Sequence, residues 1–318
     1  MYLRFFDLRE PPFELTPNAR FLFLTPRHRE ALSSLQYGLG SAKAVTVLVG
    51  EAGTGKTTLL RAALESDRCR HVRCVYLHNP ALTRGEFVEI LSRQIGLSAR
   101  AAQSKAALLT ELEAVLRERR AAGQIVALVV DEAQSLSDEL LEEIRLLANM
   151  ETATEKLLPL VLSGQPEFGD RLATPGLRQL KQRVALRCEI GPFTLQETAA
   201  YIATRIRIAG GEAARLFTRE AVMLVHERSG GIARTISVIC DNALVTAFAL
   251  GRRPVDREIV LEVCRDFDLR AAPGAPPVSA APAEAPAEPA GAVGDEMRPE
   301  SEQVASIEHR RAGVLGLR

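Results

Sequence analysis

The stretch VTVLVGEAGTGKTTLL, residues 45–60, decides the fold. It contains the pattern G-x-x-x-x-G-K-T directly after an apolar run, which is the spacing of a phosphate-binding P-loop. The four fixed positions are Gly50, Gly55, Lys56 and Thr57. Glycines let the backbone turn so that successive N–H groups point at phosphate oxygens, and the helix starting near Lys56 adds the positive end of its dipole. The pattern therefore predicts a nucleoside triphosphate site.

A second motif, IVALVVDEAQ at residues 125–134, places Asp131 and Glu132 at the end of an apolar run. Ligands of an open parallel sheet bind at the carboxyl ends of its strands, so we expect Asp131 beside the end of the P-loop strand. There Thr57 and Asp131 would hold Mg²⁺, Lys56 would reach the β- and γ-phosphates, and Glu132 would polarise the attacking water. The residues expected to bind the nucleotide are Gly50, Glu51, Ala52, Gly53, Thr54, Gly55, Lys56, Thr57, Thr58 and Asp131.

Composition is that of a globular protein without a strong charge preference. The 318 residues are 47% hydrophobic and 25% charged, with 40 basic against 40 acidic side chains. A neutral balance gives no global attraction to nucleic acid or to a membrane surface. The five scattered cysteines and the charged, proline-containing N-terminus predict reduced thiols and a cytoplasmic location. No run approaches the ~18 apolar residues of a membrane span, so we expect no transmembrane segment.

Hydrophobic periodicity predicts an α/β class followed by helices. A parallel five-stranded sheet sandwiched by helices should occupy residues 44–191, after a lead-in at 1–43 that packs on this core. The strands are expected at 44–49, 72–78, 125–131, 158–163 and 187–190, and the helices between them at 56–65, 84–95, 104–121, 138–150 and 176–184. A small all-α lid at 192–268 should contain helices at 194–209, 218–227, 234–250 and 256–267, with Thr218 and Asp256 as caps. The Ala/Pro-rich stretch at 269–318 should be a disordered tail.

The motifs together resemble one protein family. GEAGTGKTT, VVDEAQ and VLSGQPEF, with flanking sequence over roughly residues 1–268, are similar to AAA+ ATPases of the general secretion pathway protein A (ExeA) type. Relatives of that family act in MSHA biogenesis and in transposition. The resemblance implies an ATPase with ATP and Mg²⁺ as its ligands. It also implies a homo-oligomer.

The resemblance assigns further residues by their position in the family's motifs. Gln165 or Ser163 would stand at the sensor-1 place, and the sequence leaves the choice open. Arg183, or alternatively Arg178, would reach into the site of a neighbouring subunit. Arg234 in GGIAR would contact the γ-phosphate from the lid, although alanine precedes it here where the family often has proline. The candidates for the wall around the adenine are Phe13, Phe21, Phe23 and His28.

Three functions are compatible with this reading. The first is a cytoplasmic ATPase, peripheral at the inner membrane, that helps a secretion, pilus or exopolysaccharide system to assemble with an envelope partner. The second is a DNA-associated ATPase of the transposition-helper type, for which residues Arg178, Lys181, Arg183 and Arg187 would supply a local basic patch. The third is a nucleotide switch that does not hydrolyse. The Asp131–Glu132 pair argues against this switch because a switch needs no group that activates water.

Overall fold

The computed structural model describes residues 2–16, 19–78 and 81–269. These residues belong to one compact unit. The tail expected from residue 269 onward lies outside the described residues, apart from Leu269 itself.

Five parallel strands form a single sheet in the order β2-β3-β4-β1-β5. They are β1 (Val45–Gly50), β2 (Val72–Leu77), β3 (Ile125–Val130), β4 (Leu160–Gly164) and β5 (Val184–Ile190). The predicted α/β class with a five-stranded parallel sheet is confirmed. Some boundaries were wrong: the helix expected to reach residue 184 ends at Lys181, the strand expected from residue 187 begins at Val184, where it pairs with Val45 of β1, and the helix expected to reach residue 150 ends at Leu147. Tertiary pairing of the edge strand β5 here overrides the local helical pattern.

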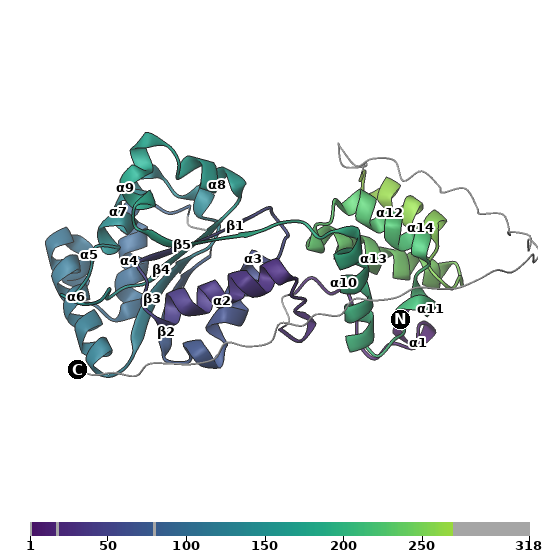
Figure 1. Cartoon of the computed structure of the whole chain (residues 1–318), viewed down its shortest axis with the longest axis horizontal. Coiled ribbons are helices and arrows are strands. Elements are labelled where there is room, and N and C mark those ends of the chain that lie inside the picture. Colours follow the sequence, from purple (N-terminus) through teal and green to yellow (C-terminus); the bar gives the residue numbers. More distant parts are fainter. Residues whose placement is uncertain (1, 17–18, 79–80, 270–318) are drawn as a thin grey trace, which may run out of the picture. The chain divides into compact units, whose positions relative to one another are not determined.

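Helices cover both faces of the sheet because the strands alternate between two apolar clusters (Figure 1). Val45, Val47 and Val49 of β1 face one cluster, whereas Leu48 faces the other. The first cluster includes buried residues of α4 (Arg84–Ile95), α5 (Ala99–Gln103), α6 (Lys105–Ala121), α7 (Asp138–Leu147), α8 (Pro166–Arg171) and α9 (Arg178–Lys181). The second contains buried residues of α2 (Pro26–Gly40) and α3 (Lys56–Leu64). Burial on both faces explains why β3 is apolar without a break and why Thr46 is the one polar residue of β1.

A third apolar cluster holds the helices that follow the sheet. These are α10 (Leu195–Ile208), α11 (Ala213–Leu216), α12 (Arg219–Ser229), α13 (Ala233–Ala249) and α14 (Arg257–Asp266). The expected caps are present. The Thr218 side chain accepts from the Ala221 N–H, and the Asp256 carboxylate accepts from the N–H groups of Glu258 and Ile259. The short α11 was not expected from the sequence.

The N-terminal lead-in contributes to two of these clusters. Helix α1 (Tyr2–Phe5) contacts α13, and Phe6, Leu8 and Phe13 are buried in the cluster of the C-terminal helices. After the short 3-10 helix η1 (Ala19–Phe21), α2 instead packs on the sheet beside β5 and α3. The lead-in therefore bridges the sheet and the C-terminal helices. The domain boundaries at 43, 191 and 268 stay predictions.

The connection from β5 to α10 is held by Gly231, which lies just before α13. The Phe193 N–H donates to the Gly231 carbonyl at 2.8 Å. Gly231 has φ of +78°, and a Cβ placed there would lie 2.2 Å from the Phe193 carbonyl oxygen. Only glycine fits this close approach without displacing the backbone. Gly231 thus fixes where α13 begins relative to the end of the sheet.

Replacing Gly231 with alanine should destabilise the protein markedly. The positive φ and the collision with Phe193 together should cost about 3 kcal/mol of folding free energy. We expect a clear fall in the midpoint of thermal unfolding, followed by circular dichroism. Gly176→Ala is the matched control, because a Cβ there meets nothing within 4 Å. Equal midpoints for Gly231→Ala and the wild type would show that the approach of Phe193 to Gly231 is not required.

Candidate functional site

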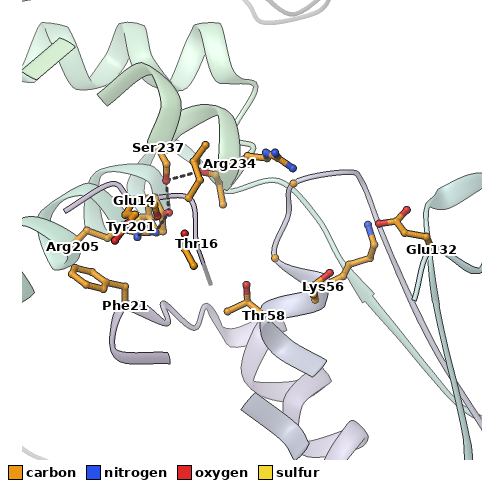
Figure 2. Close-up of a pocket in the computed structure, with 15 residues that line it drawn as sticks. Glu14, Thr16, Phe21, Lys56, Thr58, Glu132, Tyr201, Arg205, Arg234 and Ser237 are labelled. Carbon is orange, nitrogen blue, oxygen red and sulfur yellow. Dashed lines mark hydrogen bonds between the residues drawn. The ribbon is translucent and has the colours of Figure 1, made fainter. Parts of the chain in front are cut away.

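A cavity of about 360 Å³ lies where the P-loop, the start of α13 and the lead-in meet (Figure 2). The P-loop contributes Gly53, Gly55, Lys56, Thr57 and Thr58 to its wall. Glu132 follows β3, and Arg234 comes from the first turn of α13. The remaining wall consists of Glu14, Leu15, Thr16, Phe21, Tyr201, Arg205, Ala233 and Ser237. The motifs found in the sequence therefore meet at one cavity.

The P-loop owes its shape to two glycines and an internal hydrogen bond. Gly53 has φ of +80° and Gly55 φ of +102°, in the region that favours glycine. The Thr54 hydroxyl donates to the Glu51 carbonyl at 2.8 Å, which closes the turn before α3 begins. Glu51 and Ala52 are exposed and Thr54 is buried, so these three residues shape the loop without lining the cavity.

Lys56 lies folded against the loop that it belongs to. Its Nζ donates to the carbonyl oxygens of Gly50 at 2.8 Å and Glu51 at 3.0 Å. Burial lowers the pKa of the Lys56 ammonium group, and the nearby carboxylates of Glu132 and Asp131 oppose this shift. The ammonium group is thus held at the mouth of the P-loop, where it would only need to exchange carbonyl oxygens for phosphate oxygens.

Asp131 is buried and is hydrogen-bonded at both carboxylate oxygens. Its Oδ2 accepts from the Thr57 hydroxyl at 2.6 Å and from the Tyr76 hydroxyl at 3.1 Å. Its Oδ1 accepts from the Glu132 N–H at 3.1 Å. The strand order corrects one expectation, because β4 separates β3 from the P-loop strand β1. Asp131 therefore reaches Thr57 across β4 and does not lie at an adjacent strand end.

Glu132 leaves β3 in a left-handed conformation, with φ of +55° and ψ of 41°. This turn brings the Glu132 carboxylate to the cavity beside Lys56 (Figure 2). Its Oε2 accepts a hydrogen bond from Gln134 Nε2 at 2.5 Å. A left-handed backbone at a non-glycine residue is strained, and such strain concentrates at functional positions.

The N-terminus of α13 touches the P-loop directly. The Arg234 N–H donates to the Gly53 carbonyl at 3.1 Å. A Cβ on Gly53 would lie 2.9 Å from both Arg234 Cβ and Ile232 Cγ2, so glycine is required for this contact. The Arg234 side chain is exposed and lines the cavity, and its contact with a γ-phosphate stays a prediction. Two helix N-termini, those of α3 and α13, thus lie at a cavity that also contains Lys56, and all three favour an anion.

The wall opposite the P-loop depends on Arg205, which the sequence reading did not identify. Arg205 is 9% exposed, and no carboxylate pairs with it in the described part of the chain. Its guanidinium donates to the Pro12 carbonyl at 2.5 Å, the Glu14 carbonyl at 3.1 Å and the Tyr201 hydroxyl at 2.6 Å. It also lies 5.0 Å from the centre of the Phe21 ring. Arg205 therefore fastens the lead-in to α10 along the edge of the cavity.

A polar chain continues from Arg205 toward Arg234. The Tyr201 and Ser237 hydroxyls are 2.7 Å apart, and Ser237 donates to the Ala233 carbonyl at 3.1 Å (Figure 2). The only sequence signal for this wall is that Arg205 adjoins the apolar stripe of α10, where a charged residue is unexpected.

Of the four aromatic candidates for the base pocket, Phe21 alone lines the cavity. Phe13 is core, with its ring 6.2 Å from that of Phe217, and Phe23 packs on Phe193 and Tyr201. His28 is buried beneath the P-loop, where Nδ1 contacts the Thr25 hydroxyl at 2.7 Å and Nε2 contacts the Thr54 carbonyl at 3.3 Å. The assignment of these three residues to the base wall was wrong: Phe13 and Phe23 pack in the core, and the ring nitrogens of His28 contact Thr25 and Thr54.

Four other candidates lie outside the cavity. Ser163 Oγ is buried and has no hydrogen-bond partner among the described residues, and the Gln165 side chain does not line the site. Arg178 and Arg183 are exposed, and Arg183 directly precedes β5. The structure thus brings together the P-loop, Glu132 and Arg234, and leaves the roles of these four residues as predictions.

Comparison with known proteins identifies the class. Residues 39–172 match a family model described as an AAA domain. The chain is similar to Cdc6p of Pyrobaculum aerophilum, with a TM-score of 0.63 and 21% identity over 80% of this chain and 70% of that one. It is also similar to ORC2 of Aeropyrum pernix in ADPNP-ADP complexes, with a TM-score of 0.59 and 16% identity over 81% and 71%. At such identities the likeness concerns the fold alone. The chain thus contains a region that matches an AAA domain, and its fold is that of the AAA+ P-loop proteins.

Within this class, the predicted resemblance to general secretion pathway protein A is confirmed. The chain is 40% identical over 255 residues to that protein of Aeromonas hydrophila. The match covers 80% of this chain and 46% of the relative, so the chain spans about half the length of the protein it resembles. In the described ranges, no helix is long and apolar enough to cross a membrane.

Protonation of His28 should weaken the fold. Burial lowers the pKa of His28 below its usual 6.5. The unfolded chain therefore binds this proton more readily than the folded protein, and stability rises with pH in this range. The contribution is present above the unfolded pKa and is lost as the pH falls below it.

We expect the difference in melting temperature between the wild type and His28→Gln to narrow as the pH falls from about 7.5 to about 5.5. His71→Gln, at an exposed position, is the matched control and should show no such narrowing. Parallel pH profiles for the wild type and His28→Gln would contradict a buried neutral imidazole under the P-loop.

Proposed function

We propose that this chain binds ATP with Mg²⁺ in the cavity described above and hydrolyses ATP as an oligomer. One observation carries the proposal. The Thr57 hydroxyl lies 2.6 Å from the Asp131 carboxylate, and Glu132 lines the same cavity as Lys56. A phosphate cradle, a metal-binding pair and a general base are the parts that phosphoryl transfer to water requires.

The residues present suit Mg²⁺. Thr57 and Asp131 offer a hydroxyl and a carboxylate oxygen, and hard oxygen ligands are what this ion prefers. The described residues contain no cluster of three or more acidic, histidine or cysteine side chains that could hold a metal. A pair of protein oxygens with the rest from phosphate and water is the usual arrangement for a nucleotide-bound Mg²⁺. The ion would neutralise charge on the phosphates.

The protein groups around the cavity would divide the reaction among them. Lys56 and the N–H groups of the P-loop would hold the phosphate oxygens, and Arg234 would hold the γ-phosphate from α13. Glu132 would take the proton of the attacking water. The Arg234 backbone N–H also donates to the Gly53 carbonyl of the P-loop. Loss of the γ-phosphate would therefore change the contact between α13 and the sheet.

Arg183 would act on the site of a neighbouring copy. It is exposed, it directly precedes β5, and it does not line the cavity of its own chain. A guanidinium supplied by a second subunit can stabilise the charge that develops on the transferring phosphoryl group. Arg178, which is also exposed, is the second choice for this role.

The resemblance to general secretion pathway protein A supports a role for the ATPase cycle in assembling a secretion, pilus or exopolysaccharide system. The chain would then act in the cytoplasm, peripheral to the inner membrane, on a partner in the envelope. The match covers 46% of that relative, so the proposed role in assembly is inferred from the shared region alone.

Lys56→Ala should weaken ATP binding by about 100-fold, because a charged hydrogen-bond donor to the phosphates is lost. Titration calorimetry with Mg²⁺ and ATP measures the affinity. Lys43→Ala is the matched control: its ammonium group lies over the Tyr37 ring, away from the cavity, and its loss should leave the affinity unchanged. Near-normal affinity of Lys56→Ala would refute the role of the P-loop.

Turnover per protomer should rise with protein concentration, because an arginine in trans completes the site only in the oligomer. Arg183→Ala should retain ATP affinity and lose about 10³-fold or more in kcat. Arg117→Ala, in an exposed ion pair with Glu113, is the control and should leave kcat unchanged. Turnover per protomer that does not vary with concentration would contradict a finger in trans. Strong stimulation by duplex DNA that fades with salt would replace the secretion role with the DNA-associated one.

A further inference from the structure

Gln134 occupies a position between two parts of the site that are far apart in sequence. It lies in the 3-10 helix η3 (Ala133–Ser135), directly after the acidic pair. Its Nε2 donates to Glu132 Oε2 at 2.5 Å, and its Oε1 accepts from the Gln165 N–H at 3.1 Å. Gln165 is the N-cap of α8 and follows the end of β4. One side-chain amide therefore joins the proposed general base to the β4–α8 turn.

The orientation of this amide is fixed by chemistry. A backbone N–H can only donate, so the Gln165 N–H must face the amide oxygen of Gln134. The amide nitrogen of Gln134 must then face Glu132, and an ionised carboxylate can only accept. A flipped amide would place two donors together at one end and two acceptors together at the other. The Gln165 N–H thus sets which group Gln134 presents to Glu132.

A second set of bonds ties the same two segments together. Arg171, at the end of α8, donates to the Leu136 carbonyl at 2.6 Å and to the Gln134 carbonyl at 3.3 Å. Its guanidinium also pairs with Asp138 at the start of α7. The loop after Glu132 is thus fastened to α8 through both the side chain and the backbone of Gln134. From α8 the chain runs through η4 (Pro175–Leu177) and α9 to Arg183.

We propose that Gln134 is a positioning residue for the hydrolysis proposed above, on which this inference rests. Its amide holds the Glu132 carboxylate at one oxygen, and the β4–α8 turn holds the amide. In the described part of the chain only Oε2 of Glu132 is hydrogen-bonded, so Oε1 stays available to the attacking water. The orientation of the Glu132 carboxylate then depends on the position of α8, which begins the segment that leads to Arg183. If contact with a neighbouring copy shifts α8, the hydrogen bonds of Gln134 would move the Glu132 carboxylate as well.

Two substitutions at Gln134 separate positioning from packing. Gln134→Met keeps the length of the side chain and removes both hydrogen bonds. Gln134→Glu keeps an acceptor for the Gln165 N–H, but it removes the donor and sets a second carboxylate against Glu132. Both should lower kcat by about 10–100-fold, the usual effect of a misplaced catalytic group. The KM and the ATP affinity should stay within about twofold, because neither hydrogen bond of Gln134 holds the nucleotide.

The deciding experiment is a double-mutant cycle in the full chain, with steady-state turnover as the readout. Glu132→Gln removes the general base, and adding Gln134→Met to it should cause no further loss of kcat. A merely structural role would lower kcat to the same extent in both backgrounds. Gln103→Met, on the exposed side of α5, is the matched control and should leave kcat unchanged. If Gln134→Met fails to fold, judged by thermal unfolding, Gln134→Glu takes its place in the cycle.

The outcomes separate this inference from the proposed function. Normal kcat in both Gln134 variants overturns the positioning role, and so does an equal loss in the Glu132→Gln background. An increase of KM with unchanged kcat also overturns it, since Gln134 would then act on binding. If the wild type shows no turnover at any protein concentration, the proposed function itself fails and the inference fails with it.

Discussion

The hydrogen bond from the Thr57 hydroxyl to the Asp131 carboxylate is the interaction on which the rest of the site depends. It joins the first turn of α3 to the end of β3, two places that the strand order separates by β4. The bond is possible because all five strands are parallel, so that their carboxyl ends meet at one edge. Burial of β1 and β3 on both faces holds those ends rigidly. The two side chains proposed to hold Mg²⁺ and the loop proposed to hold the phosphates are therefore held together at this edge.

Around this rigid edge, the contacts to α13 are few and specific. The Gly53 carbonyl meets the Arg234 N–H, and the Gly231 carbonyl meets the Phe193 N–H. Each contact requires a glycine, since a Cβ at either position would collide with the facing residue. If the proposed nucleotide binds, a small change at the P-loop would alter the position of the start of α13 through this contact. Arg205 of α10 binds the lead-in on the opposite wall. The cavity is therefore lined by the P-loop, the C-terminal helices and the lead-in.

Local patterns in the sequence predicted the P-loop, the acidic pair and the helix caps, because each is written within a few consecutive residues. The wall of Arg205 could not be predicted in this way, since its carbonyl partners Pro12 and Glu14 lie about 190 residues away in the chain. The same reason hid the bridge from Gln134 to Gln165, which joins the ends of two different strands. The aromatic residues of the lead-in were assigned wrongly for a different reason, namely that their local pattern suits two structures. Phe13 and Phe23 are apolar enough to suit either a base pocket or a core, and the fold uses them as core.

We propose that the P-loop, the end of β3 and the start of α13 together form an ATP site at this edge of the sheet. The most direct measurement is a structure of the full chain with Mg²⁺ and a non-hydrolysable ATP analogue. We predict that Lys56 Nζ will have left the carbonyls of Gly50 and Glu51 for phosphate oxygens. Thr57 and Asp131 should face the metal, and Arg234 the γ-phosphate. A nucleotide bound elsewhere, or a Lys56 that stays on its carbonyls with the cavity unfilled, would contradict the account.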